Sequence, residues 1–415
     1  MSFNILHITT TLDGGAGNAT LRIHQSLLAR GINSKVLVRY PKECSDVYTV
    51  ALTKPLGFWY STKLGRFIRR ILHRVGIYTS KRDYLYANIK NLARNVFFTL
   101  PISEYTIHTH PLVEWANVVH LHWIQDFLDF PTFFKHVRKP ILWTCHDMNP
   151  MMGGFHHIRL REQYMKQNGQ IERVCYDIKK ESLRRCKNLS LIALSTQMHE
   201  LLETHEFFQD RKIYDIPNCV DTSIFTIGDK NVLRQEYGIS NDVYLLIFAN
   251  GFLNDSEKGL DELIKALEKI NNPRLCLLCV GDGEIPETFV SVKHLPRVSG
   301  VVNMAKMYQM ADMLVMPSHQ EAFALTPLEA MSCGVPVVMT PVSGASDLMR
   351  DFAGEVAKDF TPDALSNAIK KAISKDYNSK MIRQHILNNY TPNLISNKYL
   401  QVYQNILDMT SFVAN

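Results

Sequence analysis

The chain has 415 residues, of which 46% are hydrophobic and 21% are charged, and its formal net charge is +6. This length favours two domains, and the composition is ordinary for a globular protein. The mildly basic charge does not by itself indicate a partner. No uninterrupted apolar run reaches about 18 residues, so no transmembrane helix is expected.

Three further features of the sequence bear on partners, cellular location and cysteine chemistry. The basic residues gather in one amphipathic segment without a recognised nucleic-acid-binding module, so nucleic-acid binding is not expected. A strand-like run at 3–10 argues against a signal peptide, and we therefore expect a cytoplasmic protein with reduced thiols. Cys276 and Cys279 form a C-x-x-C inside the apolar run 275–280, which favours a buried strand over a redox or zinc site.

The first half of the chain reads as strand, glycine turn, helix and strand. A β-branched strand at 5–10 precedes a glycine turn and a helix that Gly31 ends, and a second strand follows at 35–38. This is a βαβ unit. Further short apolar strands are predicted in the same half, at 118–121, 141–144 and 189–194.

The second half repeats the alternation. Strands are predicted at 244–249, 275–280, 313–316 and 335–339, with helices at 260–270, 304–311 and from Pro327. Such alternation predicts α/β domains with parallel sheets. We therefore expect two Rossmann-like domains facing a cleft, at 1–217 and 218–395, with a C-terminal helix at about 396–415 that can pack back onto the first domain.

The segment 58–82 breaks this alternation. Apolar residues recur at helical spacing from Leu64 to Val75, basic residues lie between them, and aromatic residues precede them at 58–60. This pattern suits a helix on an anionic membrane surface and also a core-packed helix with a solvated basic face.

Two loops at strand ends in the first half are candidate sites. Gly14, Gly15 and Gly17 follow the first strand, and Gly15 and Gly17 form a G-x-G. These glycines serve either a tight turn or the close approach of a phosphate or sugar. His146, at the end of the strand 141–144, is a candidate active-site residue. A metal site made by His120, His122, His156 and His157 is conceivable, but the spacing matches no common zinc pattern.

The second half carries charged candidates. Lys258 precedes a helix at a strand end, where a lysine can neutralise a diphosphate. Glu321 lies in a loop before a helix expected to open at Thr326-Pro327, with Glu329 in its first turn as part of a capping box. The free amides of such a helix start can hold a phosphate while the two acids bind hydroxyls.

Together these residues resemble the retaining glycosyltransferases of family 4, which have the GT-B fold. The E-x7-E of Glu321 and Glu329 within EAFALTPLEAMSCGVPVV carries the resemblance. IPNCVDTSIF at 216–225, Lys258-Gly259 and VGDGE at 280–284 support it, and it spans nearly the whole chain. WTCHDMNPMMGG at 143–154 is similar to a subgroup found in bacterial surface-polysaccharide clusters.

The resemblance implies roles for single residues. Glu329 binds the ribose hydroxyls, Glu321 contacts the donor sugar, and Lys258 pairs with the diphosphate. The implied catalytic residues are Glu321, His146 and Lys258, and the implied donor-binding residues are Gly14, Gly15, Lys258, Arg297, Val298, Glu321, Phe323, Ala324, Leu325 and Glu329.

The resemblance also implies the reaction. A hexosyltransferase would move a sugar, with retention, from a UDP- or GDP-sugar to a glycan or lipid-linked acceptor in polysaccharide biosynthesis. The chain has no D-x-D, so no bound metal is expected. The location would be cytoplasmic or peripheral on the inner face of the cell membrane. The alternatives are a nucleotide-sugar 2-epimerase of similar architecture and a non-catalytic sugar-nucleotide-binding protein.

Three positions depart from the family pattern. Asn250-Gly251-Phe252 stands where most relatives carry Gly-Arg, so Lys258 must serve the diphosphate alone or with another residue such as Asn254. Ala324 stands where relatives usually carry glycine, and Phe155 stands where the subgroup often has cysteine.

Overall fold

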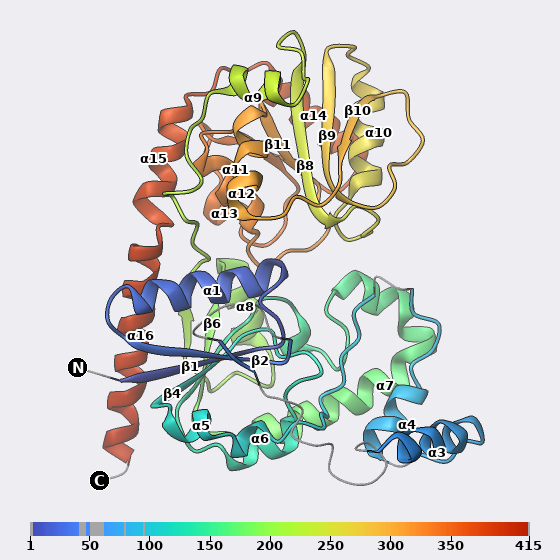
Figure 1. Ribbon diagram of the computed structural model, residues 1–415, viewed down its shortest axis with the longest axis vertical. Helices are drawn as coiled ribbons and strands as arrows, with labels where there is room; N and C mark the ends of the chain where they lie inside the picture. The colour runs from blue at the N-terminus through green and yellow to red at the C-terminus, as the bar shows by residue number, and fades with distance from the viewer. Residues whose placement is uncertain (1–2, 41–46, 50–61, 79, 94–95, 414–415) are drawn as a thin grey trace. The chain divides into compact units, whose positions relative to one another are not determined.

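The computed structural model describes residues 3–40, 47–49, 62–78, 80–93 and 96–413 (Figure 1). The chain forms two compact units. The first comprises 1–194, 198–216 and 398–415, and the second comprises 195–197 and 217–397. Apart from the short stretch 195–197, the chain passes from the first unit to the second after Ile216 and returns at Lys398.

The first unit is built on a seven-stranded sheet in the order β3-β2-β1-β4-β5-β6-β7. Its neighbouring strands pair in parallel. The central strands β4, β5 and β6 are buried throughout, as expected for a sheet covered on both faces. The strands are β1 (Asn4–Thr9), β2 (Asn33–Val38), β3 (Val47–Thr49), β4 (Val118–Leu121), β5 (Ile141–Thr144), β6 (Leu189–Ala193) and β7 (Ile213–Asp215).

Helices of unequal length surround this sheet. The helix α7 is the longest, with 28 residues, and α4 packs on it through a cluster that includes Leu85, Ile171 and Cys175. The helices of this part of the chain are α1 (Gly14–Leu28), α3 (Lys63–Arg74), α4 (Lys81–Ala87), α5 (Pro111–Trp115), α6 (Phe130–His136), α7 (Ile158–Arg185), α8 (Thr196–Thr204) and α16 (Pro392–Val413), with 3-10 turns at Ile107–Thr109 and Asn149–Met151.

The second unit has a six-stranded parallel sheet in the order β10-β9-β8-β11-β12-β13. A buried apolar cluster joins α10 and α14 to its central strands. The elements are β8 (Tyr244–Phe252), β9 (Leu275–Asp282), β10 (Ser291–Leu295), β11 (Met313–Met316), β12 (Val337–Met339), β13 (Gly354–Val356), α9 (Lys230–Glu236), α10 (Leu260–Ile270), α11 (Val301–Met310), α12 (Leu325–Ser332), α13 (Ala345–Leu348), α14 (Pro362–Ile373) and α15 (Ser379–Asn389).

The predicted alternation of parallel strands and helices is confirmed in both halves, but the expected start of α12 is wrong. The helix begins at Leu325, and its N-cap is Ala324, which has an extended backbone and no side-chain cap. Thr326 is therefore the second helical residue, and its hydroxyl contacts Met316 Sδ at 3.7 Å. Pro327 is tolerated at the third position because the first helical N–H groups have no intrahelical acceptor.

The cysteines whose positions are described are all buried, namely Cys145, Cys175, Cys186, Cys219, Cys276, Cys279 and Cys333. Cys276 and Cys279 both lie on β9, so the buried-strand interpretation of their C-x-x-C is confirmed. Burial raises the pKa of the Cys279 thiol to about 12, which keeps it protonated and unreactive.

The segment 58–82 contains α3, and residues 58–61 lie outside the described part of the chain. Leu64, Phe67, Ile71 and Val75 are 59%, 55%, 45% and 67% exposed. A core-packed helix would bury these residues, so that interpretation is wrong for these four side chains, whereas Ile68 and Leu72 of the same stripe are half-buried. Within the described ranges, no helix is both long and apolar enough to cross a membrane.

The C-terminal helix contributes to the first unit through two tyrosines. Tyr399 and Tyr403 on α16 are buried against His120 on β4. His120 Nδ1 and the Tyr403 hydroxyl are 2.7 Å apart, and His120 Nε2 lies 2.8 Å from the Thr144 hydroxyl. The end of the chain thus satisfies a polar group in the middle of the first sheet.

We expect Tyr403→Phe to destabilise the protein, because it leaves His120 Nδ1 buried without its partner. The expected loss is about 1–3 kcal/mol in the free energy of unfolding, measured by urea denaturation. Tyr84→Phe is the matched control because Tyr84 is 49% exposed. Equal stability of the two variants would contradict the structural role of this hydrogen bond.

Candidate active site

Two loops of the second unit meet because of one glycine. Gly259 has a φ of +72°, and a Cβ atom there would lie 2.1 Å from the Pro317 carbonyl oxygen. The loop before α10 is also tied to the loop after β11, because the His319 N–H donates to the Glu257 carbonyl at 2.8 Å. Only glycine allows this approach, which explains the Lys258-Gly259 pair.

The approach brings Lys258 and Glu321 together. Lys258 Nζ donates to Glu321 Oε1 at 2.6 Å, and the two side chains are only 25% and 17% exposed. Burial alone would lower the pKa of Lys258, but the Glu321 carboxylate outweighs it and the pKa is raised. The ammonium therefore stays charged, and its position is fixed relative to the start of α12.

Glu329 lies on α12 and is 8% exposed. The Tyr308 hydroxyl, from α11, donates to Glu329 Oε2 at 3.1 Å. No sequence pattern indicates a role for this tyrosine, because the sequence of α11 predicts only a helix. Tyr308 thus orients the Glu329 carboxylate, for which the sequence predicts binding to hydroxyls.

The start of α12 offers main-chain groups. Ala324 and Leu325 are half-buried, and the N-cap residue makes no side-chain hydrogen bond. The Phe323 carbonyl is already engaged, since it accepts from Asn218 Nδ2 at 2.8 Å. The amides at the beginning of α12 are therefore the available groups, and such amides attract anions.

The remaining predicted residues of this unit lie in the loops after β8 and β10. The Arg297 N–H donates to Asp282 Oδ1 at 3.0 Å, and Val298 is half-buried. Asn254 was the suggested substitute for the missing arginine. Its Oδ1 instead accepts from the Glu284 N–H at 3.0 Å, so one end of this side chain holds the neighbouring loop.

The glycines that follow β1 meet two different requirements. A Cβ atom on Gly17 would lie 2.3 Å from the Leu12 carbonyl carbon, so Gly17 is required by packing. Gly14 has a φ of +75°, and neither it nor Gly15 has any atom within 4 Å of an added Cβ. Packing does not require Gly15, and the open space beside it leaves room for a ligand.

His146 stands at the carboxyl end of β5 in a chain of imidazoles. Its Nε2 lies 3.1 Å from His122 Nδ1, and His122 Nε2 lies 2.9 Å from His7 Nδ1. Burial lowers the pKa of His146 to about 4, although Asp147 opposes this. The three rings are therefore neutral near pH 7, and each ring nitrogen of His122 either donates or accepts.

Asp147 makes a separate network. Its Oδ2 lies 2.5 Å from His156 Nδ1 and accepts from Trp123 Nε1 at 2.9 Å. Burial would raise the pKa of Asp147, but His156 outweighs it and the pKa is strongly lowered. Asp147 is thus an ionised anchor for the loop that follows His146.

The four-histidine metal site is not the grouping that the structure forms. In the described residues, the histidines with ring nitrogens within 4.8 Å of one another are His7, His120 and His122. Both ring nitrogens of His120 and His122 already have hydrogen-bonding partners. The cluster therefore fits a hydrogen-bonded network better than a set of metal ligands.

The loop after His146 is held by two buried charges on α7. Glu172 Oε1 and Oε2 accept from the Gly153 and Gly154 N–H groups at 2.9 and 2.6 Å. Lys179 Nζ donates to the carbonyl and the side-chain oxygen of Asn149 at 2.7 and 2.8 Å. Glu172 and Lys179 both lie in the long amphipathic helix α7. No local sequence pattern indicates that they hold this loop.

Comparison with known proteins finds a family model that matches most of the second unit. The family model for glycosyl transferases group 1 matches residues 229–391, which include Lys258, Glu321 and Glu329. N-acetyl-alpha-D-glucosaminyl L-malate synthase of Bacillus anthracis is 29% identical over 226 residues, which cover 50% of this chain and 58% of that protein. An uncharacterized glycosyltransferase of Methanocaldococcus jannaschii is 25% identical and covers 81% of this chain and 91% of its own.

Solved structures extend the likeness to the whole fold. Sucrose-phosphate synthase from Thermosynechococcus elongatus aligns with a TM-score of 0.68 and 16% identity, over 99% of this chain and 100% of its own. HepE from Anabaena, solved in complex with UDP, aligns with a TM-score of 0.64 and 15% identity, over 97% of this chain and 100% of the HepE chain. The predicted GT-B fold is confirmed, and the family match over 229–391 together with the relatives supports a glycosyltransferase.

The imidazole cluster predicts a loss of stability in mild acid. An unfolded histidine takes up a proton below about pH 6.5, whereas folded His146 does so only near pH 4, so stability falls as the pH drops through this window. His146 alone should account for about 2 kcal/mol between pH 7 and pH 5.

Urea unfolding at the two pH values measures this loss. Because other groups also titrate in this range, the His146→Asn variant is the comparison, and it should lose less stability than the parent. An identical loss in both proteins would show that His146 is not held neutral by the fold.

Proposed function

We propose that this protein transfers a sugar, with retention, from a UDP- or GDP-sugar to a glycan or lipid-linked acceptor in polysaccharide biosynthesis. The observation that carries the proposal is the Lys258–Glu321 pair, which stands beside the uncapped start of α12 with Glu329 on the same helix. The family match over 229–391 and the UDP in the HepE structure support a nucleotide-sugar donor.

In this proposal the charges of the site serve the leaving diphosphate. Negative charge grows on it as the bond to the sugar breaks, and Lys258 and the first amides of α12 stabilise that charge. Glu321 fixes Lys258 and contacts the donor sugar, while Glu329, held by Tyr308, binds the ribose hydroxyls. The resemblance assigns neutral His146 to the transferred sugar, and the proposed reaction requires no divalent metal.

The alternatives differ in what they need. A nucleotide-sugar 2-epimerase would act on the donor without an acceptor, and a non-catalytic protein would bind the donor without hydrolysing it.

Slow donor hydrolysis tests the reaction class. Incubation with a panel of UDP-, GDP- and ADP-sugars should release nucleoside diphosphate from one UDP- or GDP-sugar, as measured by chromatography. An epimerised nucleotide sugar as the product would support the epimerase instead. Tight binding with no turnover of any donor, with or without glycan acceptors, would support the non-catalytic alternative.

Glu329→Gln should weaken donor binding about tenfold, because a neutral amide is a poorer acceptor for two ribose hydroxyls than a carboxylate. The dissociation constant of the preferred donor is the measurement. Glu287→Gln, on an exposed position of the same unit, is the control. An unchanged constant in Glu329→Gln would remove the ribose assignment.

We further propose that α3 docks the protein on an anionic membrane. The exposed apolar residues Leu64, Phe67 and Ile71 lie on α3, and exposed Val75 follows its last residue. The same helix carries Lys63, Arg66, Arg69, Arg70 and Arg74. Exposed apolar side chains beside basic ones match the acyl and headgroup layers of an anionic surface. Arg69 is partly engaged by Asp83 at 3.8 Å, which joins α3 to α4.

Vesicle flotation tests the docking. The protein should float with vesicles containing phosphatidylglycerol and much less with pure phosphatidylcholine. Phe67→Ser with Ile71→Ser, and separately Arg66→Gln with Arg70→Gln, should each reduce flotation severalfold. Val232→Ser is the control, since Val232 is 59% exposed in the second unit. Flotation unaffected by both double substitutions would refute the α3 surface.

A further inference from the structure

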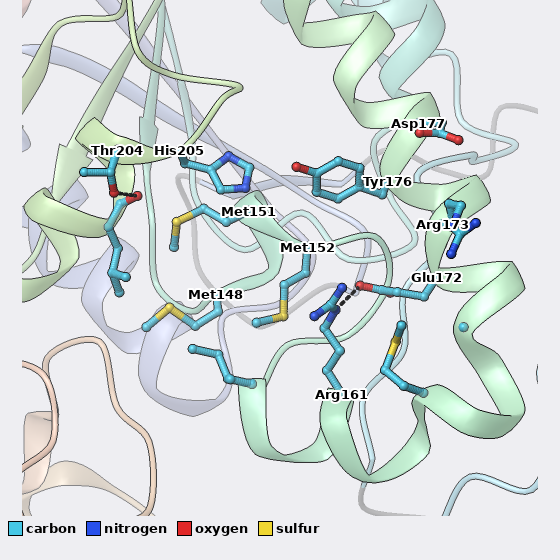
Figure 2. Close-up of a pocket in the computed structure, with 14 residues that line it drawn as sticks. Met148, Met151, Met152, Arg161, Glu172, Arg173, Tyr176, Asp177, Thr204 and His205 are labelled. Carbon is cyan, nitrogen blue, oxygen red and sulfur yellow. Dashed lines mark hydrogen bonds and ion pairs between the residues drawn. The ribbon is translucent and has the colours of Figure 1, made fainter.

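The first unit contains a cavity of about 690 Å³ between α7, the end of α8 and the loop that follows β5 (Figure 2). This volume lies within the range of small-molecule sites in proteins. Its apolar lining consists of Met148, Met151, Met152, Ile158, Met165 and Leu201, and its polar lining includes Arg161, Glu172, Arg173, Tyr176, Asp177, Thr204 and His205.

The methionines give the cavity an adaptable apolar wall. Met148 and Met152 are 3% and 8% exposed, and three methionines come from the one loop that Glu172 and Lys179 anchor. Unbranched thioether side chains can repack around apolar groups of different shapes. This wall therefore suits a flexible hydrocarbon chain better than a rigid polar ligand.

Gly169 is an unusual part of the lining. It lies within the 28-residue helix α7, where glycine costs about 1 kcal/mol relative to alanine. A Cβ atom at this position would meet nothing closer than the Met165 methyl carbon at 3.4 Å, which is ordinary contact. Packing therefore does not demand this glycine, and its effect is to widen the cavity.

The charges around the cavity balance. Arg161 Nε donates to Glu172 Oε1 at 3.0 Å, and Glu172 also accepts the loop amides, so this pair is internally compensated. Arg173 adds one positive charge and Asp177 adds one negative charge, and both side chains are exposed at the rim of the cavity. Burial lowers the pKa of His205, which leaves its ring uncharged near pH 7. A rim without net charge favours a neutral polar head over a phosphate.

We propose that this cavity binds the acceptor, and that the acceptor is a neutral amphiphilic glycoside with its hydrocarbon chain on the methionine wall and its sugar at the Arg173–Asp177 rim. Its role as acceptor rests on the proposed glycosyl transfer. The chemistry of the site is independent of that function, because the wall and the rim are complete within the first unit. The loop that supplies the wall begins directly after His146, the residue proposed to lie beside the transferred sugar.

Titration calorimetry with n-octyl β-D-glucoside and with octyl phosphate, both below their micellar concentrations, tests the site. The glucoside should bind and should bind more tightly than the phosphate. Gly169→Leu should weaken glucoside binding at least about tenfold, because the side chain fills the cavity. Its melting temperature should be equal or higher, since leucine favours the helix.

Met165→Trp fills the same space from another position and tests the proposal if Gly169→Leu does not fold. Met381→Trp is its control, because Met381 is 51% exposed on α15 of the second unit. Absence of glucoside binding, tighter binding of octyl phosphate, or binding unchanged in folded cavity-filling variants would each overturn the proposal.

Donor hydrolysis separates this proposal from the proposed function. If both hold, Gly169→Leu retains slow hydrolysis of the donor but transfers poorly to octyl glucoside. Glucoside binding without any donor turnover would leave the cavity intact as a binding site and refute the transferase. Donor turnover with unchanged transfer to the glucoside in Gly169→Leu would refute the acceptor cavity alone.

Discussion

The carboxylate of Glu172 is the constraint on which the first unit's functional face depends. A loop that leaves a parallel strand has lost the hydrogen bonds of the sheet, and its buried amides need other partners. Glu172 satisfies the amides of two glycines, and Lys179 satisfies Asn149 from the same helix. Removing either charge would leave the other groups buried and unpaired, so the loop, His146 and the methionine wall share one support.

In the second unit, backbone contacts hold the loops that leave the sheet. Gly259 lets one loop touch the Pro317 carbonyl, and the resulting proximity pairs Lys258 with Glu321. The Glu321 carboxylate holds the Lys258 ammonium in place, and a charge held in this way needs little reorganisation to stabilise a charged ligand. In the proposed transfer, a relative with an arginine at the missing position would have a second cation for the diphosphate, and here we propose that the amides of α12 serve instead.

The sequence predicted the α/β fold and the family, and it did so for physical reasons. Buried parallel strands such as β4 and β11 are short apolar runs, and the E-x7-E is local in the chain. The start of α12 was misjudged because Ala324 adopts an extended backbone that no side chain signals. Tyr308, Glu172 and the His7–His122–His146 chain were missed because each acts on residues far away in sequence, which a local pattern cannot reveal.

The burial of the cysteines has a practical consequence. Three of the described thiols lie in the first unit, at Cys145, Cys175 and Cys186, and four in the second, at Cys219, Cys276, Cys279 and Cys333. A protonated, enclosed thiol reacts slowly with an alkylating reagent until the surrounding structure opens. The rate at which each of these thiols is alkylated therefore reports how often its own unit opens. Mass spectrometry of the labelled peptides measures this rate for the two units separately.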